Sequence, residues 1–356
     1  MNAKTYHVRQ GNVGEPLSTM LRRILVGKSW SQVKQFVISR KVQVNGNLCT
    51  DETRRMKAGD IVKIFDESLA MPVSDEHLVI RYQDEHLMVV EKPAGLTTQR
   101  HIEEAHWDAA RKNRQPTLEE LLQRIIDRHG VSRMPGRGTK SGQAEQRRQI
   151  DRRFQKNEIK ITVRAVHRLD RDTSGLMIFA LSHQAEQVLV KQFSAHKIER
   201  AYLAVVAGQI TGPATIKTKI TRDRGDGVRG SLPPGKDSAD AKEAITHYKP
   251  VKALGDHTLI ECRLETGRTH QIRIHLAEAG HPLAGETTYN KPLGGQPIPD
   301  KSGAQRQALH AYRLAFDHPI TGEPLRFEQK MPPDFRKLVK RLKPDGEPDE
   351  NGGAAE

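Results

Sequence analysis

The sequence is poor in cysteine and in aromatic residues. Only two of its 356 residues are cysteines, Cys49 and Cys262, and 4% are aromatic. Two distant thiols provide neither a disulfide scaffold nor a cysteine-based zinc site, which favours a protein of a reducing compartment. So few rings also argue against a nucleic-acid platform built from many stacked side chains.

Long apolar segments are absent as well. Residues 1–16 contain no apolar stretch of the kind found in a secretory signal. The longest uncharged apolar run, GLMIFALS at residues 175–182, is too short to span a bilayer. We therefore expect a soluble, cytoplasmic protein with no membrane partner.

No motif indicates a bound cofactor or metal. Gly225, Gly227 and Gly230 fit the dinucleotide pattern GxGxxG, but the proline-containing segment after them cannot begin the helix that this pattern requires. We interpret these glycines as a hairpin loop. His270 and His275 are five positions apart, so they would not share a helix face as a zinc pair does. We expect no cofactor and no metal ion.

Positive charge, in contrast, is abundant. Lysine and arginine total 58 against 44 aspartates and glutamates, which gives a net charge of +14, and the pI is near 9.7. Such an excess favours a polyanionic partner such as RNA. The alternative is a solvated surface that only keeps the protein soluble.

Residues 15–67 have the pattern of a small separate domain. Leu17, Leu21 and Ile24 recur at helical spacing, and Ser31 can cap a second helix. The segments KVQVNG and KAGDIVKIF then predict two strands, the first of which ends in an Asn-Gly turn. The order of two helices, VxVNG and GDIV resembles the RNA-binding domain named after ribosomal small-subunit protein S-four.

Charge supports this interpretation of the N-terminal domain. Residues 1–67 contain twelve lysines and arginines against six acidic residues. Much of this charge lies on or beside the two predicted helices, which favours a surface that faces RNA phosphates. A merely solvated helix face is the alternative.

Residues 68–78 are predicted to be a linker, and residues 79–337 to form the larger domain. Strand patterns dominate it, in HLVIRY, HLMVVEKP, LMIFAL, AYLAVVAG, AITHYKPV and HTLIECRLE. Two helices are predicted, one over 117–130 with a Thr117–Glu120 capping box and one over 183–195. Many strands with few helices predict an α+β domain on a mixed, mostly antiparallel sheet.

Two further segments differ in composition from the rest. Residues 131–160 are polar and rich in lysine and arginine, which predicts a basic surface insertion. Residues 344–356 are acidic and rich in glycine, so we expect a disordered tail.

The densest chemical signal is VHRLDRDTSGLMIFALS, residues 166–182. Asp170 lies between Arg168 and Arg171, just before an apolar strand. Taken alone, Asp170 could be a turn residue in a surface ion pair. Ser174 does not fit a nucleophile elbow, which needs GxSxG.

Three segments in order carry a family resemblance: HRLDxxTSG at 167–175, RAYLAVVAG at 200–208 and ETGRTHQIRIHLAEAGHP at 265–282. On these motifs the chain from about 78 to 337 resembles the RluA/RluC/RluD-type RNA pseudouridine synthases. The segments HLMVVEKPAGL and LHAYRLAFDHPITGEPLRFEQKMPPDF are similar to that family's opening and closing segments.

The resemblance implies an isomerase that converts uridine to pseudouridine in RNA without a cofactor. Asp170 matches the family's catalytic carboxylate, and Arg273 matches the basic residue paired with it. Tyr202 matches the catalytic tyrosine that lies against the uracil and helps with proton removal. The other expected substrate contacts are Ile272 beside the base, Arg168 in the space that the flipped base leaves, and His167, Thr173 and His270.

The segment ETGRTHQIRIH is predicted to be a strand. In a strand Arg273 points the same way as Gln271 and His275, and opposite to Arg268. Together with the family match, this alternation assigns the pairing role to Arg273. Residues 285–290, GETTYN where the family often has GDxxYG, are expected to lie away from the catalytic motifs.

The resemblance favours large-subunit ribosomal RNA as the substrate, and we expect a monomer. A transfer-RNA pseudouridine synthase is one alternative. Another is a non-catalytic RNA-binding protein of ribosome assembly on the same fold. The presence of Asp170, Tyr202 and Arg273 together favours the enzyme, since an inactive copy could have lost any of them.

Overall fold

The computed structural model describes residues 3–343, apart from residues 9, 45–46, 67–74, 102–103, 130–159, 225–227, 233–234 and 236–237. Several predicted features lie outside the described residues: linker residues 68–74, the Asn45–Gly46 turn, the helix stop at Gly130, the insertion 131–160 except Lys160, Gly225 and Gly227 of the glycine-rich loop, and the tail 344–356.

The chain divides into two compact units. The first comprises Met1–Met71 and Thr218–Glu243, and the second comprises Pro72–Lys217 and Ala244–Glu356. Sequence analysis assigned all of 79–337 to one domain, so the grouping of Thr218–Glu243 with the first unit was not anticipated. None of the helices in the described part of the chain has the length and apolar character needed to cross a membrane.

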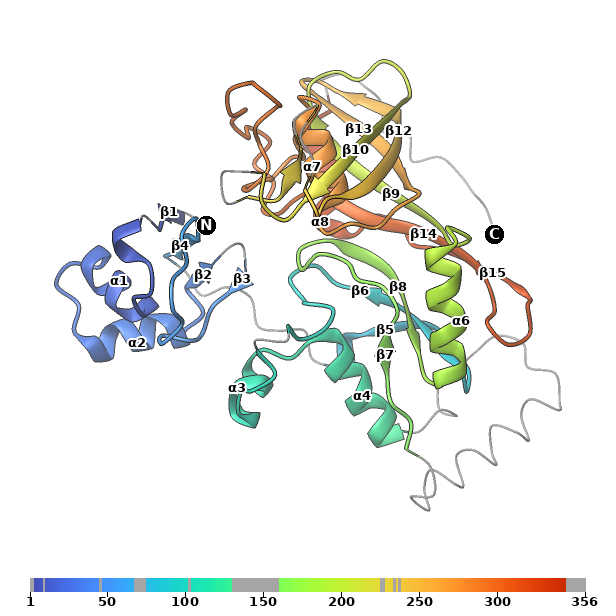
Figure 1. The fold of residues 1–356 in the computed structure, drawn as a ribbon, viewed down its shortest axis with the longest axis horizontal. Helices are drawn as coiled ribbons and strands as arrows, with labels where there is room; N and C mark the ends of the chain where they lie inside the picture. The colour runs from blue at the N-terminus through green and yellow to red at the C-terminus, as the bar shows by residue number, and fades with distance from the viewer. Residues whose placement is uncertain are drawn as a thin grey trace. The chain divides into compact units, whose positions relative to one another are not determined.

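The N-terminal part of the first unit is a four-stranded sheet with two helices (Figure 1). Its elements are β1 (Ala3–His7), a 3-10 turn (Gln10–Asn12), α1 (Leu17–Ile24), α2 (Trp30–Ile38), β2 (Val42–Val44), β3 (Asn47–Leu48) and β4 (Ile61–Phe65), in the strand order β1-β4-β2-β3. Alternate residues of β2 and β4 are buried and pack with Leu17 and Leu21 of α1. The two helices thus cover one face of the sheet.

Two details of this unit differ from the predictions. Strand β1 was missed, because its sequence AKTYH shows no apolar alternation. The cap of α2 is Ser29 and not Ser31: the Ser29 hydroxyl accepts from the Gln32 N–H, and the Gln32 side chain accepts from the Ser29 N–H. This is a complete capping box, which fixes where α2 begins.

The other strands form one large mixed sheet, ordered β11-β10-β12-β13-β9-β14-β8-β6-β5 with β15 on β14 and β7 on β8. The strands are β5 (Val79–Gln83), β6 (Leu87–Lys92), β7 (Arg164–Ala165), β8 (Ser174–Ala180), β9 (Glu199–Ala207), β10 (Ala214–Thr221), β11 (Gly230–Ser231), β12 (Lys242–Leu254), β13 (His257–Leu264), β14 (Leu309–Asp317) and β15 (Pro324–Glu328). Strand β14 runs parallel to β8 and antiparallel to β9. The predicted mixed, mostly antiparallel α+β fold is confirmed.

Helices lie on both faces of this sheet (Figure 1). Helices α4 (Leu118–His129) and α7 (Gln271–Glu278) share one core, and α6 (His183–Ser194) and α8 (Pro333–Arg341) belong to two others. The remaining elements are α3 (Ala109–Arg114) and a 3-10 turn (Asp75–His77) that precedes β5. As predicted, α4 begins in a capping box: the Thr117 N–H donates to Glu120 at 3.0 Å and the Glu120 N–H to the Thr117 hydroxyl at 3.3 Å. Sequence analysis assigned no structure to the residues of β10, β14, β15 and α8.

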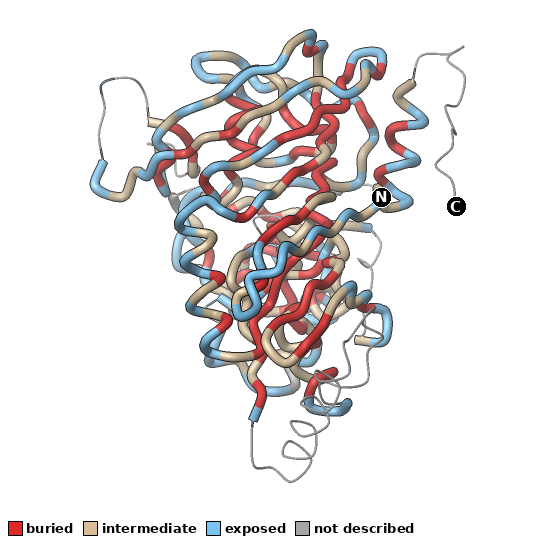
Figure 2. Tube along the Cα trace, turned by 90° about the vertical axis from the view of Figure 1, so that its right-hand side faces the viewer, coloured by how far each residue is buried: buried red, intermediate tan, exposed pale blue. Residues whose placement is uncertain are grey.

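Strands β6 and β8 are buried on both faces. Met88, Val90, Met177 and Phe179 share a core with α4 and α7, whereas the residues between them pack with α6, β14 and β15. Figure 2 shows long runs of buried residues in the interior of the molecule. An unbroken apolar run such as SGLMIFA is therefore required in β8, because both faces of this strand are buried.

Gly175 explains the glycine of the TSG motif. Its φ is +133°, and a Cβ at this position would lie 2.3 Å from the Ala311 carbonyl oxygen of β14. Only glycine allows β8 to pass this close to its parallel neighbour. Ser174 beside it is buried and bonds to His310 at 3.0 Å and to Arg306 at 3.2 Å, so it belongs to the same junction.

We predict that Gly175→Ala destabilises the protein by about 2 kcal/mol or more, because the new methyl group meets backbone that cannot move aside. Urea denaturation followed by circular dichroism measures this change. Gly212→Ala is the matched control, since a Cβ there meets nothing within 4 Å. Equal losses of stability in the two variants would contradict this account of the junction.

Candidate active site

The loop between β7 and β8 carries Asp170, and Lys92 at the end of β6 holds this loop. The ammonium group of Lys92 donates to the carbonyl oxygens of Arg171 at 2.7 Å, Thr173 at 2.8 Å and Pro93 at 3.0 Å. The side chain is 1% exposed. Burial lowers its pKa to about 7, against attraction from Asp172 and Asp170. Two of these bonds, to Arg171 and Thr173, fix the backbone just after Asp170.

Thr98 holds the same loop just before Asp170. Its buried hydroxyl donates to the Leu169 carbonyl at 3.0 Å and accepts from the Leu169 N–H at 3.3 Å. The carbonyl oxygens of Thr97 and Thr98 also accept the Leu118 and Glu119 N–H groups at the start of α4. The Asp170 loop is therefore tied to both β6 and α4.

The other half of the site is the N-terminus of α7, in the segment predicted to be a strand. That prediction is wrong: residues Gln271–Glu278 form a helix, which begins at His270 with a left-handed φ of 60°. All eight helical residues are buried, so apolar periodicity could not distinguish helix from strand. Side chains do not alternate between two faces in a helix, so strand alternation does not distinguish Arg273 from Arg268.

Arg273, in the first turn of α7, lies between two carboxylates. Its Nη1 is 3.3 Å from Asp170 Oδ2. Its Nε and Nη2 donate to the two oxygens of Glu286 at 2.7 and 2.8 Å. Its guanidinium carbon also lies 5.0 Å from the centre of the Tyr289 ring. Glu286 thus fixes the plane of the guanidinium, which leaves one edge for Asp170.

This geometry corrects the expectation that residues 285–290 lie away from the catalytic motifs. Glu286 is 4% exposed, and its Oε1 also accepts the N–H groups of Thr287 and Thr288 at 2.9 and 2.8 Å. Gly285 before it has a φ of +77°, and a Cβ there would lie 2.1 Å from the Arg306 carbonyl oxygen. The Gly285–Glu286 dipeptide therefore places a buried carboxylate beside Arg273, on the side away from Asp170.

Charges determine the ionisation of Asp170. Burial alone would raise its pKa, but His270, Arg273 and Arg168 together hold the pKa below its ordinary value. Burial lowers the pKa of His270 itself to about 4. His270 is therefore neutral at pH 7, and the two arginines keep Asp170 ionised there.

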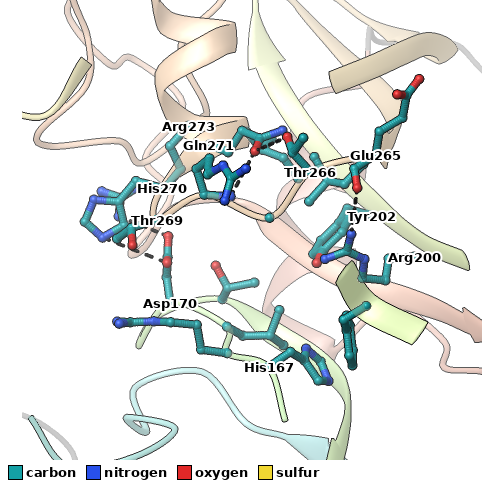
Figure 3. A pocket seen from close by; sticks show the side chains of 18 of the residues that line it. His167, Asp170, Arg200, Tyr202, Glu265, Thr266, Thr269, His270, Gln271 and Arg273 are labelled. Atoms are coloured by element: carbon teal, nitrogen blue, oxygen red, sulfur yellow. Dashed lines mark hydrogen bonds and ion pairs between the residues drawn. The ribbon is translucent and has the colours of Figure 1, made fainter. Parts of the chain in front are cut away.

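His270 is held by Tyr289 rather than by a charge. Its Nδ1 lies 2.7 Å from the Tyr289 hydroxyl, whereas its Nε2 is 3.9 Å from Asp170 Oδ1. Figure 3 shows the His270 ring beside the Asp170 carboxylate. A neutral imidazole at this place can exchange a hydrogen bond with a ligand without adding a charge.

These groups open onto a pocket of about 450 Å³, which Asp170, His270 and Arg273 line together with Tyr202 and Ile272. Tyr202 on β9 lies across the pocket from Asp170 (Figure 3). It is 6% exposed, and burial raises its pKa, so the phenol keeps its proton at pH 7. The ionised carboxylate of Asp170 thus lies across the pocket from a neutral phenol ring.

The remaining predicted residues, Arg168, His167 and Thr173, also line the pocket. Arg168 is exposed, and Thr173 is buried with its hydroxyl 3.4 Å from the Gln307 amide. His167 accepts the Ile178 N–H at 3.0 Å, stacks 4.7 Å from Phe193, and has a pKa lowered to about 3 by burial. Its neutral ring is thus bonded to β8.

Sequence reasoning missed three residues that support the site. Glu286 carried a signal, since it stands where the family often has an acid. Lys92 lies in the quoted segment HLMVVEKPAGL, but its contacts with residues 171 and 173 depend on folding. Thr98 carried no signal at all. Among the described residues no group of three or more His, Cys, Asp or Glu side chains is arranged to hold a metal ion.

Two family models match the chain. The model described as RNA pseudouridylate synthase matches residues 86–278, and the S4 domain model matches residues 15–62. The first match includes Asp170, Tyr202 and Arg273.

Curated relatives match over different lengths. Ribosomal large subunit pseudouridine synthase D of Xanthomonas campestris is 41% identical over 186 residues, or 51% of this chain and 55% of that protein. The chain therefore aligns with only about half the length of the first such relatives. The protein of the same name from Vibrio parahaemolyticus is 30% identical over 352 residues, covering 96% of this chain and 95% of that protein.

Two solved human structures have a similar fold. RNA Pseudouridylate Synthase Domain Containing 4 matches with a TM-score of 0.52 and 20% identity, over 74% of this chain and 92% of that one. RNA Pseudouridylate Synthase Domain Containing 1 matches with a TM-score of 0.50 and 23% identity, over 78% and 100%.

We predict that Glu286→Gln lowers the free energy of unfolding by about 3 kcal/mol, because it leaves a buried guanidinium without its main counter-ion. Urea denaturation measures the loss. Glu328→Gln is the control, since its ion pair with Arg313 is at the surface with the glutamate side chain 63% exposed. A Glu286→Gln variant as stable as this control would show that Arg273 does not depend on the second carboxylate.

We also predict a pH dependence of stability from His275 of α7, which is 0% exposed and bonds to the Thr246 hydroxyl at 2.9 Å. Burial lowers its pKa to about 4 from 6.5. Between pH 6.5 and 4 the unfolded chain therefore binds a proton at His275 that the folded chain does not bind. Stability is lost as the pH falls through this range.

A His275→Gln variant keeps a hydrogen-bonding side chain without the titration. Its stability should fall less steeply with acidification, by up to about 1.4 kcal/mol per pH unit. Denaturant titrations at several pH values between 7 and 4 measure both slopes. Identical slopes would mean that the pKa of His275 is the same in the folded and the unfolded protein.

Proposed function

The chain belongs to the RNA pseudouridylate synthase family, and on that basis we propose that it isomerises uridine to pseudouridine in large-subunit ribosomal RNA. The observation that carries the proposal is the Asp170–Arg273 pair, 3.3 Å apart in a pocket of about 450 Å³. The substrate class follows from the names of the relatives, which are ribosomal large subunit pseudouridine synthases.

The chemistry needs one ionised carboxylate at the ribose. The bond from the anomeric carbon to the ring nitrogen breaks, the base turns, and the same carbon bonds to carbon five. Carbon five loses a proton and the freed ring nitrogen gains one, so the product is an isomer of the substrate. No electrons are gained or lost overall, so the reaction requires no redox cofactor. We assign the carboxylate to Asp170, which Arg273 and Arg168 keep ionised.

Other residues of the pocket would position the base. We propose that Tyr202 and Ile272 pack against the uracil, and that the protonated phenol of Tyr202 acts as a hydrogen-bond donor rather than as a base. His270 and Thr173 supply polar contacts. We propose that His167 supports the loop rather than touching the substrate, because the Ile178 N–H already occupies its Nε2.

The target base must leave its stack before it can enter the pocket, which costs a few kcal/mol. Arg168 is exposed at the pocket wall. We propose that its guanidinium fills the space that the flipped base leaves, since a planar cation can stack and donate hydrogen bonds together.

For the organisation of the chain we propose an RNA-binding domain over residues 15–67, a linker over 68–78 and a catalytic domain over 79–337. The S4 match over 15–62 supports the first of these. We propose that the enzyme is a cytoplasmic monomer; its low cysteine content fits a reducing compartment.

The substrate proposal is tested by mapping pseudouridines in total RNA from a deletion strain. We expect specific uridines of large-subunit RNA to lose the modification and to regain it with the wild-type gene but not with an Asp170→Asn gene. Loss confined to transfer RNA would overturn the substrate class. An unchanged map would overturn the enzyme assignment.

Asp170→Asn should abolish isomerisation while RNA affinity stays within a few-fold, because charge changes and shape does not. We expect turnover below about 1% of wild type, given the typical contribution of an acid–base group. Single-turnover assays on a large-subunit RNA fragment measure it. Asp317→Asn, which removes an exposed acid, is the control. A rate for Asp170→Asn near that of the control would refute the role.

Arg273→Lys should lower turnover roughly tenfold, about 1.4 kcal/mol, with RNA binding little changed. A single ammonium cannot hold Glu286 with two parallel bonds and also reach Asp170. Arg268→Lys is the matched control, because Arg268 of the preceding loop bonds to Gln271 through its backbone N–H. Equal rates for the two lysine variants would show that Arg273 is not the arginine that pairs with Asp170.

A further inference from the structure

Trp30 is exposed on the surface of the N-terminal domain. It is 53% exposed, and it is the only aromatic side chain among the strongly exposed large apolar residues of the described chain. The buried side chains of α2 are Val33 and Val37, so the core does not use this ring. Val26, in the turn between α1 and α2, is 88% exposed.

Arg22 of α1 covers one face of this ring. Its guanidinium carbon lies 4.9 Å from the centre of the Trp30 ring. Trp30 is the first residue of α2, and the Ser29–Gln32 capping box fixes the backbone there. A cation–π contact at an exposed site is worth about 0.5–1 kcal/mol, enough to favour one orientation of the ring. The ring is therefore oriented while half of its surface stays open.

The charge around the ring identifies the chemistry of its partner. Residues 16–50 contain six lysines and arginines and no acidic residue. Arg23 and Lys34 pair with Glu15 and Glu52, which lie just outside this segment on either side. An apolar protein surface would gain little from so many cations, whereas a nucleic-acid strand supplies both phosphates for the cations and bases for the ring.

We propose that Arg22 and Trp30 form a stacking site for one unpaired base of the RNA substrate. The proposal rests on the proposed function for the choice of RNA, and it adds a contact outside the catalytic pocket. The base would lie on the open face of Trp30, with Arg22 on the other face. Stacking of this kind tolerates any base, so the site would read single-strandedness rather than sequence.

The chain offers a direct optical test, because it has only two tryptophans, Trp30 and Trp107. In a Trp107→Phe protein all tryptophan fluorescence comes from Trp30. We expect saturable quenching by a single-stranded oligouridylate or by a hairpin with an unpaired loop. A fully paired RNA duplex of the same length should quench much less at the same salt concentration.

Affinity measurements separate stacking from phosphate binding. Trp30→Ala should weaken binding of the looped hairpin about tenfold and leave the slope of log affinity against log salt unchanged. Trp30→Phe should recover most of the loss. Lys28→Gln, which removes one exposed cation of residues 16–50, should instead flatten the slope. Val251→Ala is the matched control, since Val251 of β12 is a 52% exposed apolar side chain.

Two results would overturn the proposal. One is wild-type affinity of Trp30→Ala for every RNA with its circular dichroism unchanged. The other is Trp30-dependent self-association in sedimentation experiments without quenching by RNA, which would make the patch a protein interface. The titration needs no turnover, so an inactive enzyme that still shows quenching contradicts only the proposed function. An active enzyme whose Trp30→Ala variant binds normally contradicts only the stacking site.

Discussion

The candidate site depends on one buried cation between two carboxylates. Arg273 contacts Asp170 and Glu286, which lie 103 residues before it and 13 residues after it in the sequence. Burying a guanidinium is costly unless its donors are bonded and its charge is balanced. Glu286 accepts two hydrogen bonds from the guanidinium and balances its charge. Its Oε1 also accepts backbone N–H groups. Asp170 can then face the pocket as an ionised group.

The backbone around Asp170 is as constrained as its side chain. Lys92 and Thr98 bond to the loop on the two sides of Asp170, and Gly175 lets β8 run against β14 immediately after it. Catalytic geometry is lost when a reacting group moves by about 1 Å, so such support has a functional reason. The supporting groups come from β6, the segment before α4 and β14, all of which are distant in the chain from the Asp170 loop.

Neutral histidines keep the electrostatics of the site simple. Burial lowers the pKa values of His167, His270 and His275 well below 7, so these rings add hydrogen bonds without positive charge. Of the three groups that lower the pKa of Asp170, only Arg273 and Arg168 are then charged at neutral pH. The histidine rings hold the loop and the helix in place without adding charge.

The sequence by itself determined the elements whose signals are local. The unbroken apolar run of β8, the Thr117–Glu120 capping box and the ordered motifs around Asp170, Tyr202 and Arg273 can all be recognised within a few residues. Only the tertiary structure decided that Gln271–Glu278 is a helix, because its complete burial removes the periodicity that separates helix from strand. Only the tertiary structure brought Glu286 behind Arg273 and left Trp30 exposed under Arg22, because burial and ion pairing depend on which distant segments meet.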